Sequence, residues 1–216
     1  ADFVHKSIDA GKDAIMQLAE KHYFACEWSE NPAVFNSDSL AGKYDVVIFL
    51  NTSGNILDSA QTKALNNFVE NGGGFVGIHG ATATMENSAS YIEMTGARFV
   101  SHPYVQTAML TVKDKNHPST AHLPDNWLWT DEWYVFDELS PDMNVLLEVD
   151  ETSYNPAHSW EQTQGMGSFH PIAWHKAQGK GRVFYTALGH HAALYNDPLF
   201  LQHIYGGIFW AWNASD

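Results

Sequence analysis

The sequence contains a single cysteine, Cys26, among its 216 residues. One cysteine excludes an internal disulfide and any zinc site built from several cysteines. Cys26 stands in the short apolar run 24–28, where we expect a small buried side chain rather than a nucleophile. Cysteine usage therefore leaves the compartment open, and we expect a cytoplasmic or periplasmic protein.

Basic residues are also scarce, with 11 lysines and arginines against 25 aspartates and glutamates and a formal net charge of -14. Such a surface repels phosphate backbones and anionic lipid heads, so we expect neither nucleic acid nor a membrane as partner. No apolar run approaches the about 20 residues of a membrane-spanning helix. The charge balance favours a neutral small molecule or a cation as ligand.

Several short catalytic motifs are missing. The sequence has no His-Glu-x-x-His, no Cys-x-x-Cys and no Gly-x-Ser-x-Gly. The glycines 72–74 precede an expected strand rather than a helix, which argues against a phosphate-binding loop, and we expect no nucleotide cofactor. A metal site would have to be assembled from distant segments.

Apolar runs in the first half of the chain predict a βαβ unit. Residues 44–50 form a nearly continuous apolar run, typical of a strand covered on both faces. A helix is expected at 58–71, where Asp58 and Gln61 have the spacing of a capping box, and a second strand at 74–79. Such a unit is parallel and right-handed. We therefore predict one α/β domain over residues 1–216 with a mainly parallel sheet.

The same patterns place the other elements. We predict helices at 7–22, 88–96 and 198–212, and strands at 24–28, 106–112, 145–149, 171–175 and 183–188. Residues 113–133 are expected to be irregular and residues 150–168 to form a long loop. A doubly wound sheet begins with a strand, but only Ala1–His5 precede the first helix, so we expect that first strand to be missing.

The twelve histidines form two sets. One set lies at predicted strand ends or beside glycine and proline: His79, His102, His170, His175, His190 and His191. The other lies in helix ends and loops, where we expect solvated or structural roles: His5, His22, His117, His122, His158 and His203. Because ligands bind at the carboxyl ends of parallel strands, the first set can converge on one rim of the sheet.

Two histidines of the first set have the clearest positions. His79 ends the strand 74–79, and Gly80 then permits a tight turn. A histidine there can act as a general base, bind a metal or simply cap the strand. His190 follows the strand 183–188 through Gly189 and offers the same alternatives. For His191 the spacing favours a structural role.

The run Asp131-Glu132-Trp133-Tyr134 places two carboxylates beside two aromatic rings. Apolar neighbours raise a carboxyl pKa and suit the group to acid or base catalysis. The aromatic rings could stack on sugar faces. The alternative, favoured by spacing alone, is a turn with one solvated acid.

Five segments together resemble the ThuA-like, trehalose-utilisation family. They are GGGFVGIHGA (72–81), FVSHP (99–103), DEWY (131–134), GMGSFHPIAW (165–174) and GRVFYTALGHH (181–191). The start of the chain, DFVHKSI, resembles the segment after that family's first strand. The family belongs to the class I glutamine amidotransferase-like group, so the resemblance implies a flavodoxin-like, three-layer α/β sandwich.

The resemblance also implies a chemistry. In that group a cysteine stands where this chain has His79, and its histidine partner corresponds to His190. Without the cysteine, glutamine hydrolysis is not expected. The resemblance implies disaccharide catabolism instead, with oxidised 3-keto-glycosides as substrates and a divalent metal, zinc or similar, in the cleft.

Our first hypothesis is a carbohydrate-processing enzyme that acts on a glycoside or 3-keto-glycoside by hydrolysis or elimination, with a metal as an optional aid. We assign catalysis to His79, Glu132 and His190, and a metal site to His79, His102 and His190. Substrate binding is assigned to Asp131, Trp133, Tyr134, His170 and His191. The rival hypotheses are a non-catalytic sugar-binding or regulatory module and an amidohydrolase with a water nucleophile. The expected partner is a small carbohydrate, and a homo-oligomer stays open.

Overall fold

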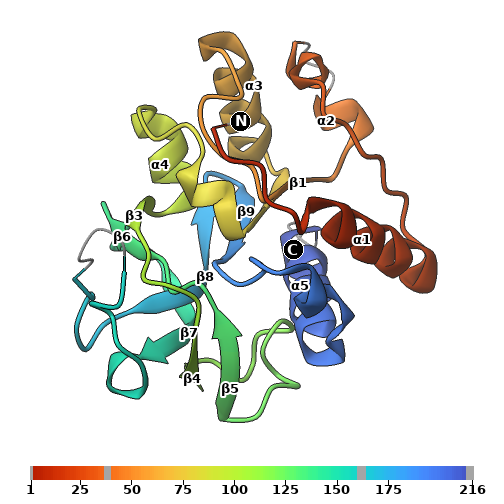
Figure 1. Ribbon diagram of the computed structural model, residues 1–216. Coiled ribbons are helices and arrows are strands. Elements are labelled where there is room, and N and C mark those ends of the chain that lie inside the picture. The colour runs from red at the N-terminus through yellow and green to blue at the C-terminus, as the bar shows by residue number, and fades with distance from the viewer. Residues whose placement is uncertain (1, 37–39, 160–163, 213–216) are drawn as a thin grey trace.

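A seven-stranded sheet with helices on both faces forms the centre of the molecule (Figure 1). The structure is a computed structural model that describes residues 2–36, 40–159 and 164–212. In spatial order the strands are β1 (Val46–Leu50), β2 (Gly74–Ile78), β9 (Gly181–Thr186), β8 (Pro171–Gln178), β7 (Asn144–Asp150), β4 (Gln106–Val112) and β5 (Asn126–Asp131). Two short strands, β3 (Arg98–Ser101) and β6 (Val135–Asp137), form a separate antiparallel pair.

The sheet is mixed, which corrects the prediction of a mainly parallel sheet. Its pairs β1-β2 and β2-β9 are parallel, whereas the four pairs from β9 across to β5 are antiparallel. Continuous apolar runs report burial on both faces, and a wide covered sheet buries its central strands whichever way they run. Gly179 closes the turn between β8 and β9 with a left-handed φ of 58°.

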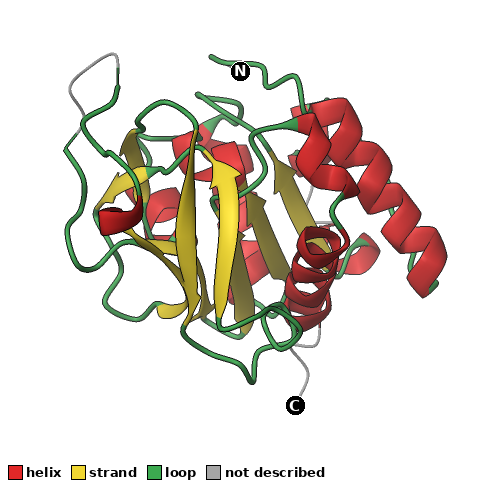
Figure 2. Cartoon of the chain, turned by 60° about the horizontal axis from the view of Figure 1, so that its bottom comes forward, coloured by secondary structure: helices red, strands yellow, loops and turns green. Residues whose placement is uncertain are grey.

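Two helices cover each face of the sheet (Figure 2). On one side α5 (Pro198–Trp212) packs against β2 and β9, with α1 (Ile8–His22) beside it. On the other side α3 (Ser59–Glu70) and α4 (Ala89–Thr95) pack against β9. A short helix, α2 (Leu40–Lys43), contacts α3. These positions confirm the helices predicted at 7–22, 58–71, 88–96 and 198–212.

The predicted capping box of α3 is confirmed. The Asp58 carboxylate accepts from the Gln61 backbone N–H at 2.8 Å, and the Asp58 N–H donates to the Gln61 side-chain oxygen at 2.9 Å. Such reciprocal bonds satisfy two backbone donors at the helix start. Among the described residues, no helix is long and apolar enough to cross a bilayer.

Two local predictions were wrong. Residues 113–133 are not irregular throughout, because β5 alternates exposed and buried side chains, with Trp127, Trp129 and Asp131 facing inward. Residues 24–28 form no strand. They line a hollow of about 900 Å³ together with residues of β1, with which they do not pair.

β1 is one of the two edge strands of the sheet, and the described residues contain no strand ahead of α1. A second hollow of about 750 Å³ has residues of β1 and of the N-terminal segment in its wall. The expectation of a missing first strand stays a prediction.

Candidate active site

Three chemically active side chains meet at one edge of the sheet because the strands that carry them run in the same direction. Four antiparallel pairs separate β9 from β5, so β5 points the same way as β2 and β9. His79 directly follows β2, Glu132 follows β5, and His190 stands four residues after β9. Carboxyl ends of strands at one edge are where α/β proteins bind ligands.

The turn after β2 is tight and holds His79 in an unusual backbone conformation. His79 has a φ of 49°, in the left-handed region that non-glycine residues rarely adopt. A Cβ on the following Gly80 would lie 2.5 Å from the carbonyl oxygen of Thr52, so only glycine fits there. Backbone strain of this kind gathers at functional sites.

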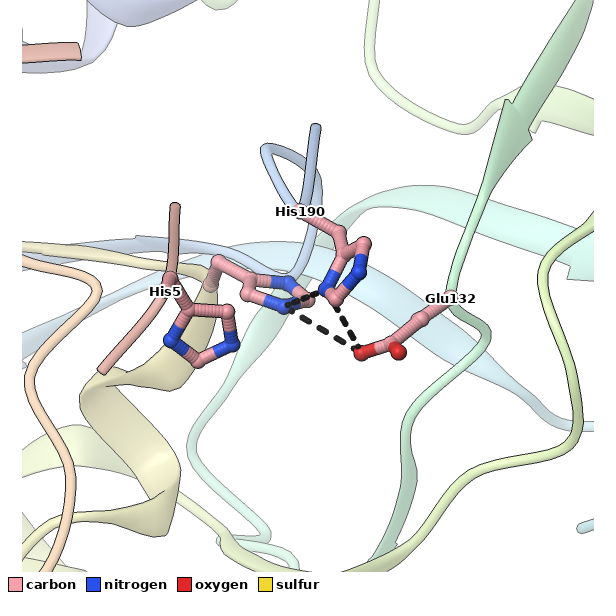
Figure 3. Close-up of side chains that lie close together, drawn as sticks. His5, Glu132 and His190 are labelled. Carbon is pink, nitrogen blue, oxygen red and sulfur yellow. Dashed lines mark hydrogen bonds and ion pairs between the residues drawn. The ribbon is translucent and has the colours of Figure 1, made fainter. Parts of the chain in front are cut away.

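Glu132 is the centre of the site (Figure 3). Its Oε2 lies 3.0 Å from His190 Nδ1 and 3.4 Å from His79 Nε2. Its other oxygen, Oε1, lies 3.5 Å from His102 Nδ1. Burial by itself would raise the pKa of Glu132, but hydrogen bonding to His190 and His79 and the charges of His79 and His102 outweigh burial and hold that pKa well below its usual value. Glu132 is therefore ionised.

The ring of His79 is fully buried and has a fixed tautomer. Its Nδ1 lies 2.6 Å from the carbonyl oxygen of Ala187, and a carbonyl can only accept, so Nδ1 carries the proton. In the neutral ring Nε2 is then an acceptor. That nitrogen lies 3.0 Å from the Tyr134 hydroxyl and 3.3 Å from His190 Nδ1.

His5 joins this group, although the sequence predicted a solvated or structural role for it. The side chain is 6% exposed, and its ring packs edge-on against His79 and His190, with centroids 4.8 Å and 5.5 Å away. Burial, with the charges of His79 and His190, lowers the pKa of His5 to about 3. The place of His5 could have been inferred from its position just before the first helix. A segment that leads into a helix at this edge of the sheet must pass over the strand ends, which brings its side chains near His79 and His190.

The structure changes the set of residues that could hold a metal. His5, His79, His190 and Glu132 each offer one ligand atom, and these atoms all lie within 4.8 Å of one another. Three imidazoles and one carboxylate suit zinc and similar transition metals. The predicted ligand His102 is not in this set. It lies beside Glu132 Oε1, and its Nδ1 is 2.9 Å from the Pro103 carbonyl oxygen.

Asp131 is completely buried beside the site, and its carboxylate links two chain segments through hydrogen bonds. One carboxylate oxygen accepts from the backbone N–H groups of Glu132 and His190, at 3.0 Å and 3.1 Å. The other accepts from the Gly189 N–H at 2.8 Å and the Trp129 indole at 3.2 Å. These bonds tie the end of β5 to the loop after β9. Substrate contact by Asp131 stays a prediction.

The other predicted substrate-binding residues differ in their access to ligand. Trp133 is fully buried, and its indole donates to the Gln106 carbonyl at 3.0 Å. His170 is also buried, with Nδ1 2.6 Å from Glu151 and Nε2 2.8 Å from the carbonyl oxygen of Tyr134. His191 is exposed, and its ring packs against His190. Of these residues, His191 is the one open to solvent.

Comparison with known proteins gives one family and one fold. The family model described as ThuA, trehalose utilisation, matches residues 1–211. A ThuA-like protein from Bacteroides uniformis has a TM-score of 0.80 at 23% identity, over 96% of this chain and 86% of that one. A ThuA-like protein from Parabacteroides merdae has a TM-score of 0.73 at 20% identity, over 98% and 87%. No protein with a curated description matches the sequence.

The fold is also similar, more distantly, to part of a glycosidase. A beta-galactosidase from Bacillus circulans has a TM-score of 0.53 at 15% identity, over 82% of this chain but 23% of that one. At such identities the likeness shows a shared fold and nothing about activity.

Proposed function

Because the chain belongs to the ThuA, trehalose-utilisation family, we propose that it is a carbohydrate-processing enzyme that cleaves a 3-keto-glycoside by elimination followed by addition of water. The observation that carries the proposal is the buried, ionised Glu132 held against His79 and His190 where three strands end. A paired carboxylate and imidazole can move protons, and this edge of the sheet is open to ligand at His190 and His191.

The proposed substrate supplies an acidic C–H bond. A ketone at ring position 3 acidifies the proton at position 2. When a base removes that proton, the electron pair forms a double bond between positions 1 and 2 and expels the glycosidic oxygen, which leaves with a proton from an acid. Water then adds across the double bond, and the net reaction is hydrolysis.

His190 is the side chain best placed to exchange protons with the substrate. Its side chain is 19% exposed, against 8% for Glu132 and 0% for His79. Glu132 holds Nδ1 of His190, which leaves Nε2 for the substrate. We assign Glu132 the task of orienting that ring and balancing its positive charge, as the carboxylate does in a catalytic triad.

The donor set described above fits a divalent metal. Its residues would be His5, His79, His190 and Glu132, and a cation bound there would place positive charge near the site, where it would offset negative charge that develops on the substrate. In that complex His79 Nε2 would bind the cation in place of the Tyr134 hydroxyl, and Asp131 would keep His190 in position through the backbone.

The proposal is tested by turnover of a 3-keto-glucoside, with the released sugar followed by NMR. We expect Glu132→Gln and His190→Gln to lower kcat/KM at least about 100-fold, the usual contribution of a positioned acid or base. His158→Gln is the matched control, because His158 is exposed and its ring contacts Tyr104 rather than the site. Folded Glu132→Gln and His190→Gln variants with wild-type turnover would refute the proposal.

Calorimetry separates the enzyme from its rival. Binding of the same 3-keto-glucoside that survives a chelator, with no product after long incubation, would identify a non-catalytic sugar-binding module. Turnover of glutamine without turnover of the sugar would identify an amidohydrolase.

A further inference from the structure

We propose that His5, His79, His190 and Glu132 together bind one transition-metal ion of the zinc type, and that His5 fastens the N-terminal segment to the sheet through that ion. As an account of catalysis this inference rests on the proposed function. The binding of the ion itself can be measured without any substrate, so the two proposals can fail separately.

The distances among three of the four donor atoms match a tetrahedral site, and the donor atom of His5 lies within 4.8 Å of them. Ligand bonds of about 2.0–2.1 Å in a tetrahedron place neighbouring ligand atoms about 3.3–3.4 Å apart. Glu132 Oε2 lies 3.4 Å from His79 Nε2 and 3.0 Å from His190 Nδ1, and these two nitrogens are 3.3 Å apart. Three of the four ligands thus form one face of the required polyhedron, and His5 is the fourth.

The tautomer of His79 is the one that a metal ligand needs. Its Nδ1 donates to the Ala187 carbonyl, so Nε2 of the neutral ring presents a lone pair to the cluster. A backbone carbonyl on the far nitrogen is the usual outer partner of a metal-bound histidine. The lone pair of His79 Nε2 and the carboxylate oxygen Glu132 Oε2, 3.4 Å apart, repel each other. A cation bound between these two atoms would turn that repulsion into attraction.

His5 is buried in the same cluster. The residue is 6% exposed, and one of its ring nitrogens lies within 4.8 Å of the ligand atoms of His79, His190 and Glu132. Figure 3 shows the His5 ring at the side of the cluster opposite Glu132.

The segment around His5 is anchored on both sides. Before it, the Phe3 N–H donates to the Ser53 hydroxyl at 2.9 Å, and that hydroxyl lies 2.6 Å from the Phe3 carbonyl oxygen. After it, the Asn51 side-chain amide donates to the Ser7 hydroxyl at 2.8 Å. Residues 3–7 are therefore held beside the chain that follows β1, and His5 is delivered to the cluster with little freedom left to lose on binding.

The test is zinc stoichiometry and affinity of the full chain, without substrate. The protein is stripped with a chelator, refilled with zinc, and analysed by mass spectrometry and by competition with a chromogenic chelator. We expect one zinc per chain, and at least about 100-fold weaker binding in His5→Gln, above the 10–100-fold typical of losing an outer partner. His158→Gln is the matched control, because His158 is exposed and is not one of the four cluster residues, and it should keep wild-type affinity.

Two further readouts make the outcome decisive. Zinc should raise the melting temperature of the wild type and of His158→Gln, but raise that of His5→Gln much less. Cobalt in the wild-type protein should give the intense visible spectrum of a tetrahedral site, which decides the matter even if His5→Gln does not fold. Wild-type protein that takes up no zinc, or His5→Gln with undiminished affinity, would overturn the inference. Turnover that persists in zinc-free protein would leave the proposed function standing and remove the metal from it.

Discussion

Asp131 shows how a residue without a free oxygen can control the site. Its carboxylate accepts four N–H groups, and two of these belong to the backbones of Glu132 and His190. The two side chains to which we assign proton transfer are thus placed by the same buried carboxylate. Each of its oxygens accepts two hydrogen bonds from the protein itself.

We predict that Asp131→Asn lowers the free energy of unfolding by about 2–4 kcal/mol, because the new amide hydrogens would face N–H donors that lose their acceptor. Urea denaturation followed by fluorescence measures the change. Asp142→Asn is the control, since Asp142 is exposed, and it should shift the same quantity by less than about 0.5 kcal/mol. A wild-type free energy of unfolding for Asp131→Asn would show that the hydrogen bonds of the Asp131 carboxylate do not stabilise the fold.

At the residue scale the sequence revealed much of the cluster but not all of it. His79, Glu132 and His190 were predicted from their positions at strand ends, and the structure brings them within 3.4 Å of one another. Their catalytic role stays a prediction. His5 was missed because its partners lie 74 or more residues away, a distance at which local pattern carries no information.

At the scale of the elements, the segment between β7 and β8 is held in place by hydrogen bonds to the carboxylate of Glu151. Glu151 accepts from the backbone N–H groups of Met166 and Gly167, at 2.5 Å and 2.9 Å, and from His170 Nδ1 at 2.6 Å. His170 in turn bonds to the Tyr134 carbonyl. The loop that was predicted at 150–168 is therefore tied, through Glu151 and His170, to the chain that carries Glu132.

We predict that Glu151→Gln loosens this connection, because the amide can accept fewer bonds and would direct N–H groups toward other donors. Amide hydrogen exchange of residues 164–170 should become about 10–100-fold faster, equivalent to a local loss of about 1.4–2.8 kcal/mol at 1.4 kcal/mol per tenfold. Exchange in α5 serves as the internal reference and should not change. Equal protection in both proteins would contradict the assigned role.

The elements themselves were predicted with uneven success for physical reasons. Long helices such as α1 and α5 repeat their apolar positions often enough to be recognised. Residues 24–28 have the composition of a strand but no partner to pair with, and a strand needs one. β5 was missed although Trp127 and Trp129 alternate with exposed residues, because polar neighbours on either side concealed a short alternation.

On the scale of the whole molecule, buried neutral histidines make stability depend on pH. Burial, together with the charges of His175 and His203, lowers the pKa of His117 to about 3. Burial lowers the pKa of His203 to about 4. In the unfolded chain both groups have a pKa of about 6.5, so as the pH falls the unfolded state takes up protons first.

We predict that the protein is most stable above pH 6.5 and loses stability as the pH falls from 6.5 toward 4. Each of these histidines adds about 1.4 kcal/mol per pH unit to the slope within that window. Urea denaturation at a series of pH values measures it, and the slope should be smaller by about that amount in His117→Asn. An identical slope in the variant would contradict the shifted pKa of His117.

The direction of the strands was the largest error at this scale. The βαβ unit of β1, α3 and β2 was predicted as parallel and is confirmed. Extending that direction to β8 and β4 was wrong, because side-chain hydrophobicity encodes burial and not strand direction. The mixed arrangement nevertheless brings β5 round to the same direction as β2 and β9, which is why Glu132 and the two histidines could be expected at one edge.

The most direct test of the proposed chemistry is deuterium incorporation during cleavage of a 3-keto-glucoside in heavy water. Elimination removes the proton at ring position 2, and the later addition of water returns a hydrogen from the solvent. NMR of the released keto-sugar should therefore show deuterium at position 2 with the wild type, at a rate far above that without protein and strongly reduced in Glu132→Gln and His190→Gln. Product released by the wild type without deuterium at that position would contradict the proposed mechanism.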